Sequence, residues 1–95
     1  MSERYQYLEN RYKVFKQCGI NPHDTRYNLH HVLQKEDVRR GLTPPDFDVN
    51  ARSNLVPLKI EQHERLNQII NSCDFMRNDI TNRVHLANLA FIEEL

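Results

Sequence analysis

Large apolar residues near the start of the chain recur at the spacing of an α-helix. Four of them lie three or four positions apart: Tyr5, Leu8, Tyr12 and Phe15. This spacing places all four on one face of a helix. Ser2 is a suitable N-terminal cap, and Gly19 is a suitable stop. We therefore expect an amphipathic helix between these two residues, with an apolar stripe and a solvated surface around it.

Two short extended stretches are predicted in the middle of the chain. The aromatic and branched residues of 27–33 (YNLHHVL) favour a strand. Residues 34–42 are polar and charged and suit one or two helical turns, and the prolines at 44–45 prevent a helix from continuing. The second stretch, 54–58 (NLVPL), contains Pro57, which has no amide hydrogen to donate. This stretch is therefore expected at a sheet edge or a strand end.

The C-terminal part of the chain is predicted to form two helices. Residues 59–71 carry one stripe that mixes apolar and polar side chains: Ile60, His63, Leu66, Asn67 and Ile70. A last helix is expected from about Asp79 to near Leu95. Its apolar residues are spread widely enough around the helix that it should pack on more than one neighbour.

Length and composition are typical of one globular domain. The chain has 95 residues, 27% of them charged and 39% hydrophobic, so a single domain over 1–95 is expected. No apolar run approaches the roughly 20 residues of a transmembrane helix. No apolar stretch follows the first charges, so a secretory signal is not expected. Cys18 and Cys73 are too few for a disulfide scaffold or a four-cysteine zinc site. We therefore expect two free thiols and a cytoplasmic location.

The charge balance argues against a protein that coats nucleic acid without specificity. Lysine and arginine number 13 and the acidic residues number 13, so the formal net charge is zero. Such coats are normally basic, but a small basic face around one site is compatible with a neutral total. The 5 histidines are a high share for this length. Histidine is suited to metal ligation and to proton transfer near neutral pH.

The order of polar residues between positions 30 and 67 is the most informative feature. His30 and His31 close the first extended stretch, and Asn54 opens the second. His63 follows on the predicted helix, and Asn67 lies one turn further on the same face. Three segments carry the resulting resemblance to the HNH endonuclease family: LHHVL at 29–33, NLVPL at 54–58 and H-x-x-x-N at 63–67.

This resemblance implies an α+β fold built around a ββα-metal core, also called a His-Me finger. Two short antiparallel strands and one helix would form the core at about 27–71, with an N-terminal and a C-terminal helix beside it. Two features depart from the common pattern. The chain lacks the cysteine pairs that bind a structural zinc in many HNH domains, and its connection between His31 and Asn54 is long. Packing of the flanking helices would have to replace the zinc.

The resemblance also implies a role for each residue of the pattern. His31 would be the general base that takes a proton from water, and Asn54 would tie the loop so that this base points correctly. His30 and His63 would be metal ligands, and Asn67 is either a third ligand or a solvated helix residue. Neighbouring residues in a regular strand point to opposite faces. The two adjacent histidines can therefore serve one site only if the strand ends, twists or bulges there.

The implied cofactor is one divalent metal ion. Two imidazoles and an amide suit Zn²⁺, Ni²⁺, Mn²⁺ or Co²⁺ by ligand softness, whereas the family often works with Mg²⁺. The implied reaction is hydrolysis of DNA to a 5′ phosphate and a 3′ hydroxyl. DNA contacts are expected from basic residues near the metal: Arg39, Arg40, Arg52 and Lys59. The alternative for Arg39 and Arg40 is a solvated cluster balanced by Glu36 and Asp37. His23 and His85 lie outside the pattern and are expected to be structural or surface residues.

A competing interpretation is a non-catalytic interaction module. An HNH-like fold would then keep its histidines for packing or a structural metal, and would inhibit or recruit a protein partner such as another nuclease. The neutral net charge favours the module, and the intact set of histidines and asparagine favours the enzyme. A toxin nuclease domain with an inhibitory partner would share the same active site. The small size, without zinc-binding cysteine pairs, suits a phage-encoded nuclease acting in a host cell, and the sequence leaves the oligomeric state open.

Overall fold

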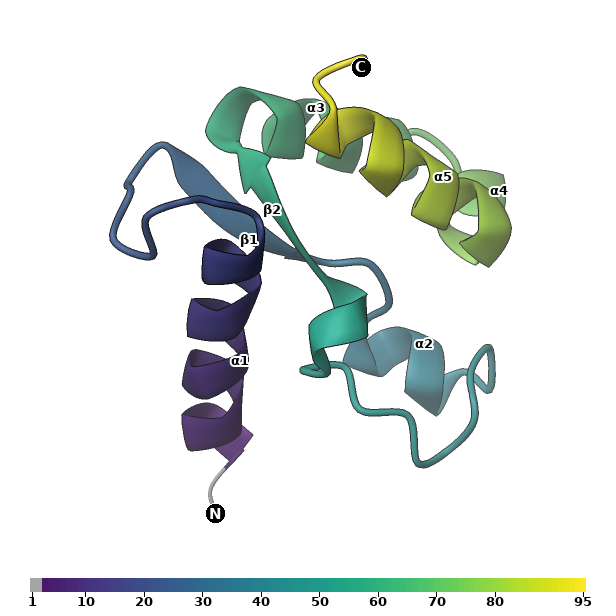
Figure 1. Ribbon diagram of the computed structural model, residues 1–95. Helices are drawn as coiled ribbons and strands as arrows, with labels where there is room; N and C mark the ends of the chain where they lie inside the picture. The colour runs from purple at the N-terminus through teal and green to yellow at the C-terminus, as the bar shows by residue number, and fades with distance from the viewer. Residues whose placement is uncertain (1–2) are drawn as a thin grey trace.

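A two-stranded antiparallel sheet between helices organises residues 3–95, the part of the chain that this computed structural model describes (Figure 1). The elements in chain order are α1 (Glu3–Gln17), β1 (Tyr27–His31), α2 (Lys35–Arg39), the short 3₁₀ helix η1 (Arg52–Asn54), β2 (Leu55–Lys59), α3 (Ile60–Ile70), α4 (Asp74–Asn78) and α5 (Ile80–Phe91). The α+β class expected from the sequence is confirmed. Ser2, the expected cap of the first helix, lies outside the described residues.

The sheet pairs the two stretches that the sequence predicts to be strands. In its register, His30 lies opposite Val56 and His31 opposite Leu55. The first strand ends at His31, two residues earlier than the expected 27–33. It ends there because the backbone N–H and C=O of Leu33 bond to the side chain of Asn54 instead of to a neighbouring strand. The end of β1 is therefore fixed by a side chain from the start of the second strand.

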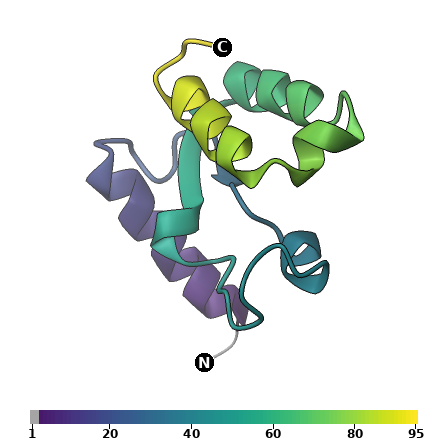
Figure 2. The same ribbon diagram turned by 90° about the vertical axis from the view of Figure 1, so that its right-hand side faces the viewer.

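The helices lie on two sides of the sheet. Both views show α1 on one side and the group α3, α4 and α5 on the other, with α2 set apart on the long connection between the strands (Figures 1 and 2). The buried apolar cluster lies between the sheet and the C-terminal helices and consists of Val32, Leu58, Leu66, Ala87 and Ala90. No helix between residues 3 and 95 is long and apolar enough to cross a membrane.

The α1 helix forms as predicted, but most of its apolar stripe faces outward. Phe15 is fully buried, whereas Tyr5, Leu8 and Tyr12 are 56%, 51% and 49% exposed. The inward face is polar at Asn10, which donates to the carbonyl of Asn50 at 2.8 Å, and apolar further on at the buried Val14. Only the last turns of α1 reach apolar neighbours. Periodicity therefore located the helix correctly and assigned its buried face wrongly.

The C-terminal region contains one helix more than expected. The short helix α4 has no buried residue, so it leaves no hydrophobic pattern in the sequence. Asp79 begins α5 as expected, because its carboxylate accepts the N–H of Asn82. The helix stops at Phe91 rather than near residue 95. Glu93 adopts a left-handed conformation with φ of 61°, and the N–H of Glu94 bonds back to the carbonyl of Leu89, which closes the helix end.

A buried ion pair attaches the long connection to the C-terminal helices. Arg83 on α5 donates two hydrogen bonds to the carboxylate of Asp37 on α2, at 2.9 and 3.1 Å. Both side chains are only 6% exposed. Asp37 also accepts the N–H of Gln34, which begins the helix. The connection is thus held to the C-terminal helices by a buried charged contact. Cys18 and Cys73 are both free and exposed, as expected.

Candidate active site

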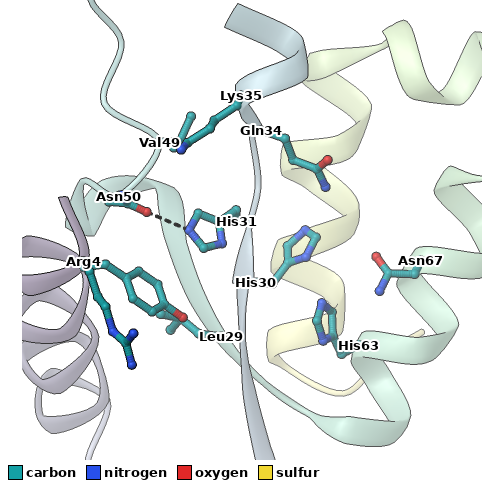
Figure 3. A pocket seen from close by; sticks show the side chains of 11 residues that line it. Arg4, Leu29, His30, His31, Gln34, Lys35, Val49, Asn50, His63 and Asn67 are labelled. Carbon is teal, nitrogen blue, oxygen red and sulfur yellow. Dashed lines mark hydrogen bonds between the residues drawn. The ribbon is translucent and has the colours of Figure 1, made fainter.

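The residues of the sequence pattern gather around one pocket of about 620 Å³ (Figure 3). Its lining comes from α1, the end of β1, the start of α2, the loop before η1, and α3: Arg4, Tyr7, Leu29, His30, His31, Gln34, Lys35, Val49, Asn50, His63 and Asn67. All of the histidines in the pattern and Asn67 are therefore brought together. Asn54 lies outside the lining and acts on the loop behind it.

His30 faces α3 and is almost completely buried, at 3% exposure. Its Nε2 has no hydrogen-bond partner within the described chain. Its ring meets the ring of His63 edge to face, with 5.1 Å between the ring centres. Burial, reinforced by the neighbouring charges of His63, His31 and Arg83, lowers the pKa of His30 to about 4. A buried imidazole that is neutral at pH 7 and has a free nitrogen is a ready metal ligand.

His63 projects from α3 toward the same space (Figure 3). Burial lowers its pKa too, although the nearby Glu64 opposes this effect. Asn67 follows one turn later and also lines the pocket. Asn67, the possible third ligand of the sequence pattern, therefore lines the same pocket as the two imidazoles.

A test of fit supports a metal at His30 and His63. Two imidazoles that share one ion through bonds of about 2.1 Å hold their ring centres roughly 5 Å apart, close to the observed 5.1 Å. A buried nitrogen without a hydrogen-bond partner lowers the stability of the fold, and a bound metal would give the Nε2 of His30 a partner. Among residues 3–95, no three side chains of the His, Cys, Asp and Glu types converge. Asn67, whose amide lines the same pocket, is the third ligand that the sequence pattern offers.

His31 points to the other side of the strand end, toward α1 (Figure 3). Its Nε2 lies 3.0 Å from Oδ1 of Asn50, and its ring stacks on Tyr7 with 5.6 Å between centres and 16° between planes. The alternation of a regular strand therefore still separates the two histidines. Both histidines line one pocket because β1 ends at His31, and beyond this residue no strand separates the two sides.

Asn54 fastens the loop that carries these groups. Its Oδ1 accepts the N–H of Leu33 at 2.9 Å, and its Nδ2 donates to the carbonyls of Leu33 and Val49, both at 2.8 Å. The side chain is 4% exposed. One amide thus joins the segment just after His31 to the segment just before Asn50. Such a bridge fixes the distance between the two residues that contact each other in the pocket.

The basic residues expected at the DNA lie elsewhere. None of the four lines the histidine pocket in the described structure: Arg39, Arg40, Arg52 and Lys59. Arg39 forms an ion pair with Glu36 at the surface, as in the alternative of a balanced charge cluster. Lys59 pairs with Glu93 at 2.8 Å. Arg52 lines a separate hollow beside η1. Nearness along the sequence therefore did not bring these cations to the site.

Sequence reasoning missed several pocket residues, among them Arg4, Tyr7, Lys35 and Asn50. Arg4 and Tyr7 are neighbours on one face of α1, Lys35 begins α2, and Asn50 ends the loop before η1. The spacing of Arg4 and Tyr7 is helical, but only the fold shows that this face of α1 meets the histidines. Asn50 carries no local signal, because asparagine is common in loops. The cations of this pocket are thus Arg4 and Lys35.

No family model, curated protein or solved structure matches the chain. The resemblance to HNH endonucleases therefore depends on the pattern of residues and on the geometry of the pocket.

Proposed function

We propose that the chain is a metal-dependent DNA endonuclease of the HNH type. In this proposal β1, β2 and α3 form the ββα-metal core, and the histidine pocket is the active site. The observation that carries the proposal is the pair of imidazoles His30 and His63. His30 is buried and His63 partly buried, burial lowers the pKa of both, and their ring centres are as far apart as those of two ligands of one ion would be. The Nε2 of His30 has no hydrogen-bond partner in the described chain.

The proposed metal ligands are His30, His63 and Asn67. A divalent metal bound by them would supply positive charge for the scissile phosphate and for the leaving 3′ oxygen. The neutral state of both histidines favours binding, because a metal then displaces no proton from either ring near pH 7. Two imidazoles and one amide leave room for water and phosphate in the remaining positions.

His31 is the proposed general base. It lies in the same pocket as the ligands but on the opposite side of the strand end, so its ring remains available to water. The ring takes the proton of the attacking water while the water oxygen bonds to phosphorus. The bond between phosphorus and the 3′ oxygen breaks, and that oxygen gains a proton from solvent. The products are a 5′ phosphate and a 3′ hydroxyl.

Arg4 and Lys35 are the proposed contacts to the DNA backbone. They lie on α1 and α2, at the same edge of the pocket as His31 (Figure 3). Cationic side chains in such positions neutralise phosphates and hold the duplex without reading its sequence. This placement provides a small basic edge within a chain of zero net charge.

A plasmid-cleavage assay tests the proposal. Purified chain is incubated with supercoiled plasmid in EDTA and in Mg²⁺, Mn²⁺, Co²⁺, Ni²⁺ or Zn²⁺. Cleavage is expected with at least one metal and not with EDTA. His31→Ala should lower the rate by about 100-fold or more while metal binding, measured by titration calorimetry, is retained. His85→Ala provides the matched control, because His85 is an exposed histidine on α5 outside the pocket.

The metal ligands give a second, separable result. His63→Ala should abolish both cleavage and metal binding, whereas His31→Ala should abolish cleavage alone. A folded chain that binds metal and cleaves no DNA under any of these conditions would reject the endonuclease. That result would favour the competing interpretation of a non-catalytic interaction module. The next experiment would then be a search for its protein partner with the wild-type chain.

A further inference from the structure

The hydrogen bond between His31 and Asn50 determines which ring nitrogen of His31 carries the proton. A carboxamide oxygen can only accept a hydrogen bond. Because Oδ1 of Asn50 faces Nε2 of His31 at 3.0 Å, Nε2 must be the protonated nitrogen. The other nitrogen, Nδ1, is then the one with a free lone pair. Figure 3 shows it on the side of the ring away from Asn50.

Asn50 is itself held firmly enough to impose this tautomer. It is buried. Its backbone N–H donates to the carboxylate of Asp48 at 3.0 Å, and its carbonyl accepts Nδ2 of Asn10 at 2.8 Å. The preceding residue, Val49, is fastened by the amide of Asn54. The side chain of Asn50 thus extends from a backbone that is bonded on both sides, and it cannot follow the histidine ring if the ring turns.

Tyr7 restrains the same ring in the remaining direction. Its ring lies nearly parallel to that of His31, at an angle of 16°, with 5.6 Å between the centres. A hydrogen bond at one nitrogen still permits the ring to tilt about that bond, and a stacked aromatic neighbour opposes the tilt. Tyr7 and Asn10 both lie on the inward face of α1, so one helix supplies the stack and the support for Asn50.

We propose that Asn50 and Tyr7 are positioning residues that hold the ring of His31, a residue of the pocket lining, as the Nε2–H tautomer and so leave Nδ1 as its basic nitrogen. The inference rests on the proposed role of His31 as the general base. It makes α1 part of the catalytic apparatus, although α1 lies outside the ββα core.

The tautomer can be read directly in the full-length wild-type chain. Long-range ¹H–¹⁵N correlation spectra distinguish the protonated from the lone-pair nitrogen in each imidazole, with and without Mg²⁺, and a His31→Gln sample assigns the signals. The expected result is a single Nε2–H form for His31. Asn50→Ala should broaden the ring signals or mix the two forms. An Nδ1–H form in the wild-type chain would overturn the proposal, since Asn50 would then donate to Nε2.

Kinetics on an oligonucleotide duplex give an independent readout. Asn50→Ala should lower kcat by about tenfold or more, as the loss of an orienting contact typically does, while KM and metal affinity stay within about twofold. Asn50→Asp keeps an acceptor facing Nε2 and should recover most of the kcat. Tyr7→Ala should lose severalfold in kcat, and Tyr7→Phe, which keeps the stacked ring, should recover most of that loss. Circular dichroism confirms that each variant is folded.

The outcomes separate this inference from the proposed function. A wild-type chain without nuclease activity would refute the endonuclease itself. An active wild-type chain whose Asn50→Ala variant is folded and keeps its full kcat would refute only the positioning role. A kcat loss in Asn50→Ala that Asn50→Asp does not recover would likewise show that the acceptor oxygen is not what matters.

Discussion

Replacing Asn54 with alanine should destabilise the chain by about 3 kcal/mol. The amide makes three hydrogen bonds in a buried position, one from the N–H of Leu33 and two to the carbonyls of Leu33 and Val49. Each such bond contributes about 1 kcal/mol net, and a buried partner left without a bond costs about 1–3 kcal/mol. A domain of this size has an unfolding free energy of roughly 5–14 kcal/mol. The substitution therefore removes a large part of it.

Urea unfolding measures this effect. With a slope of roughly 1–1.5 kcal/mol per molar urea, a loss of about 3 kcal/mol lowers the midpoint by about 2–3 M. Asn28→Ala is the matched control, because Asn28 is an exposed asparagine on β1 and should change stability by less than about 0.5 kcal/mol. If Asn54→Ala unfolds at the same urea concentration as Asn28→Ala, the bridge does not hold the loop and the reasoning fails.

Asn54→Asp tests the two halves of the bridge separately. An aspartate can still accept the N–H of Leu33, but it places negative charge against the two carbonyls that the native Nδ2 contacts. The variant should therefore be at least as unstable as Asn54→Ala near pH 7. Protonation of the introduced carboxylate in acid gives it an O–H that can donate to one of these carbonyls. The stability of Asn54→Asp relative to Asn54→Ala should therefore increase as the pH falls. Equal stability of Asn54→Asp and wild type at pH 7 would contradict the assigned orientation of the amide.

Three further predictions concern other parts of the structure. The pKa of His30 falls to about 4 on folding from an ordinary 6.5, so below pH 6.5 the unfolded state binds the proton first. Stability of the metal-free chain should then fall as the pH drops from 6.5 to 4, by up to about 3 kcal/mol from this residue, and His30→Gln should flatten that part of the curve in unfolding measured across pH. Arg83→Met should cost about 3–5 kcal/mol by leaving Asp37 buried without its cation, and adding Asp37→Leu should recover part of the loss in a double-mutant cycle. Arg4→Ala should weaken duplex binding and reduce the slope of log affinity against log salt by about 0.9, whereas Arg40→Ala, outside the pocket, should leave the slope unchanged.

The sequence predicted the parts of the fold whose signals are local. Strand composition, the proline in 54–58 and helical spacing located both strands and three of the helices within a few residues. Three residues of the predicted pattern, His30, His31 and His63, line one pocket, because the expected strand and the expected helix form where the sequence placed them. These features depend on neighbours in the chain, so one sequence suffices to find them.

The parts that failed depend on contacts between distant segments. The stripe of Tyr5, Leu8 and Tyr12 has helical spacing, but spacing does not say which face another segment will cover. Asn10 turns inward because the carbonyl of Asn50 lies opposite it, and nothing near residue 10 reveals that partner. The same limit applies to Asn50, whose importance comes from the ring it meets in β1.

Three polar contacts fix the long connection between the strands to the rest of the fold. Its start is fixed by the bridge from Asn54 to Leu33, its middle by the buried pair of Asp37 with Arg83, and its end by the bond from Asn10 to Asn50. The partner residues Asn54, Arg83 and Asn10 belong to η1, α5 and α1, respectively. Each anchor is polar and directional, so it sets position as well as stability. Loosening any anchor should therefore move His31 or its partner Asn50 before the whole domain unfolds, and activity should be lost at lower urea concentrations than the buried core.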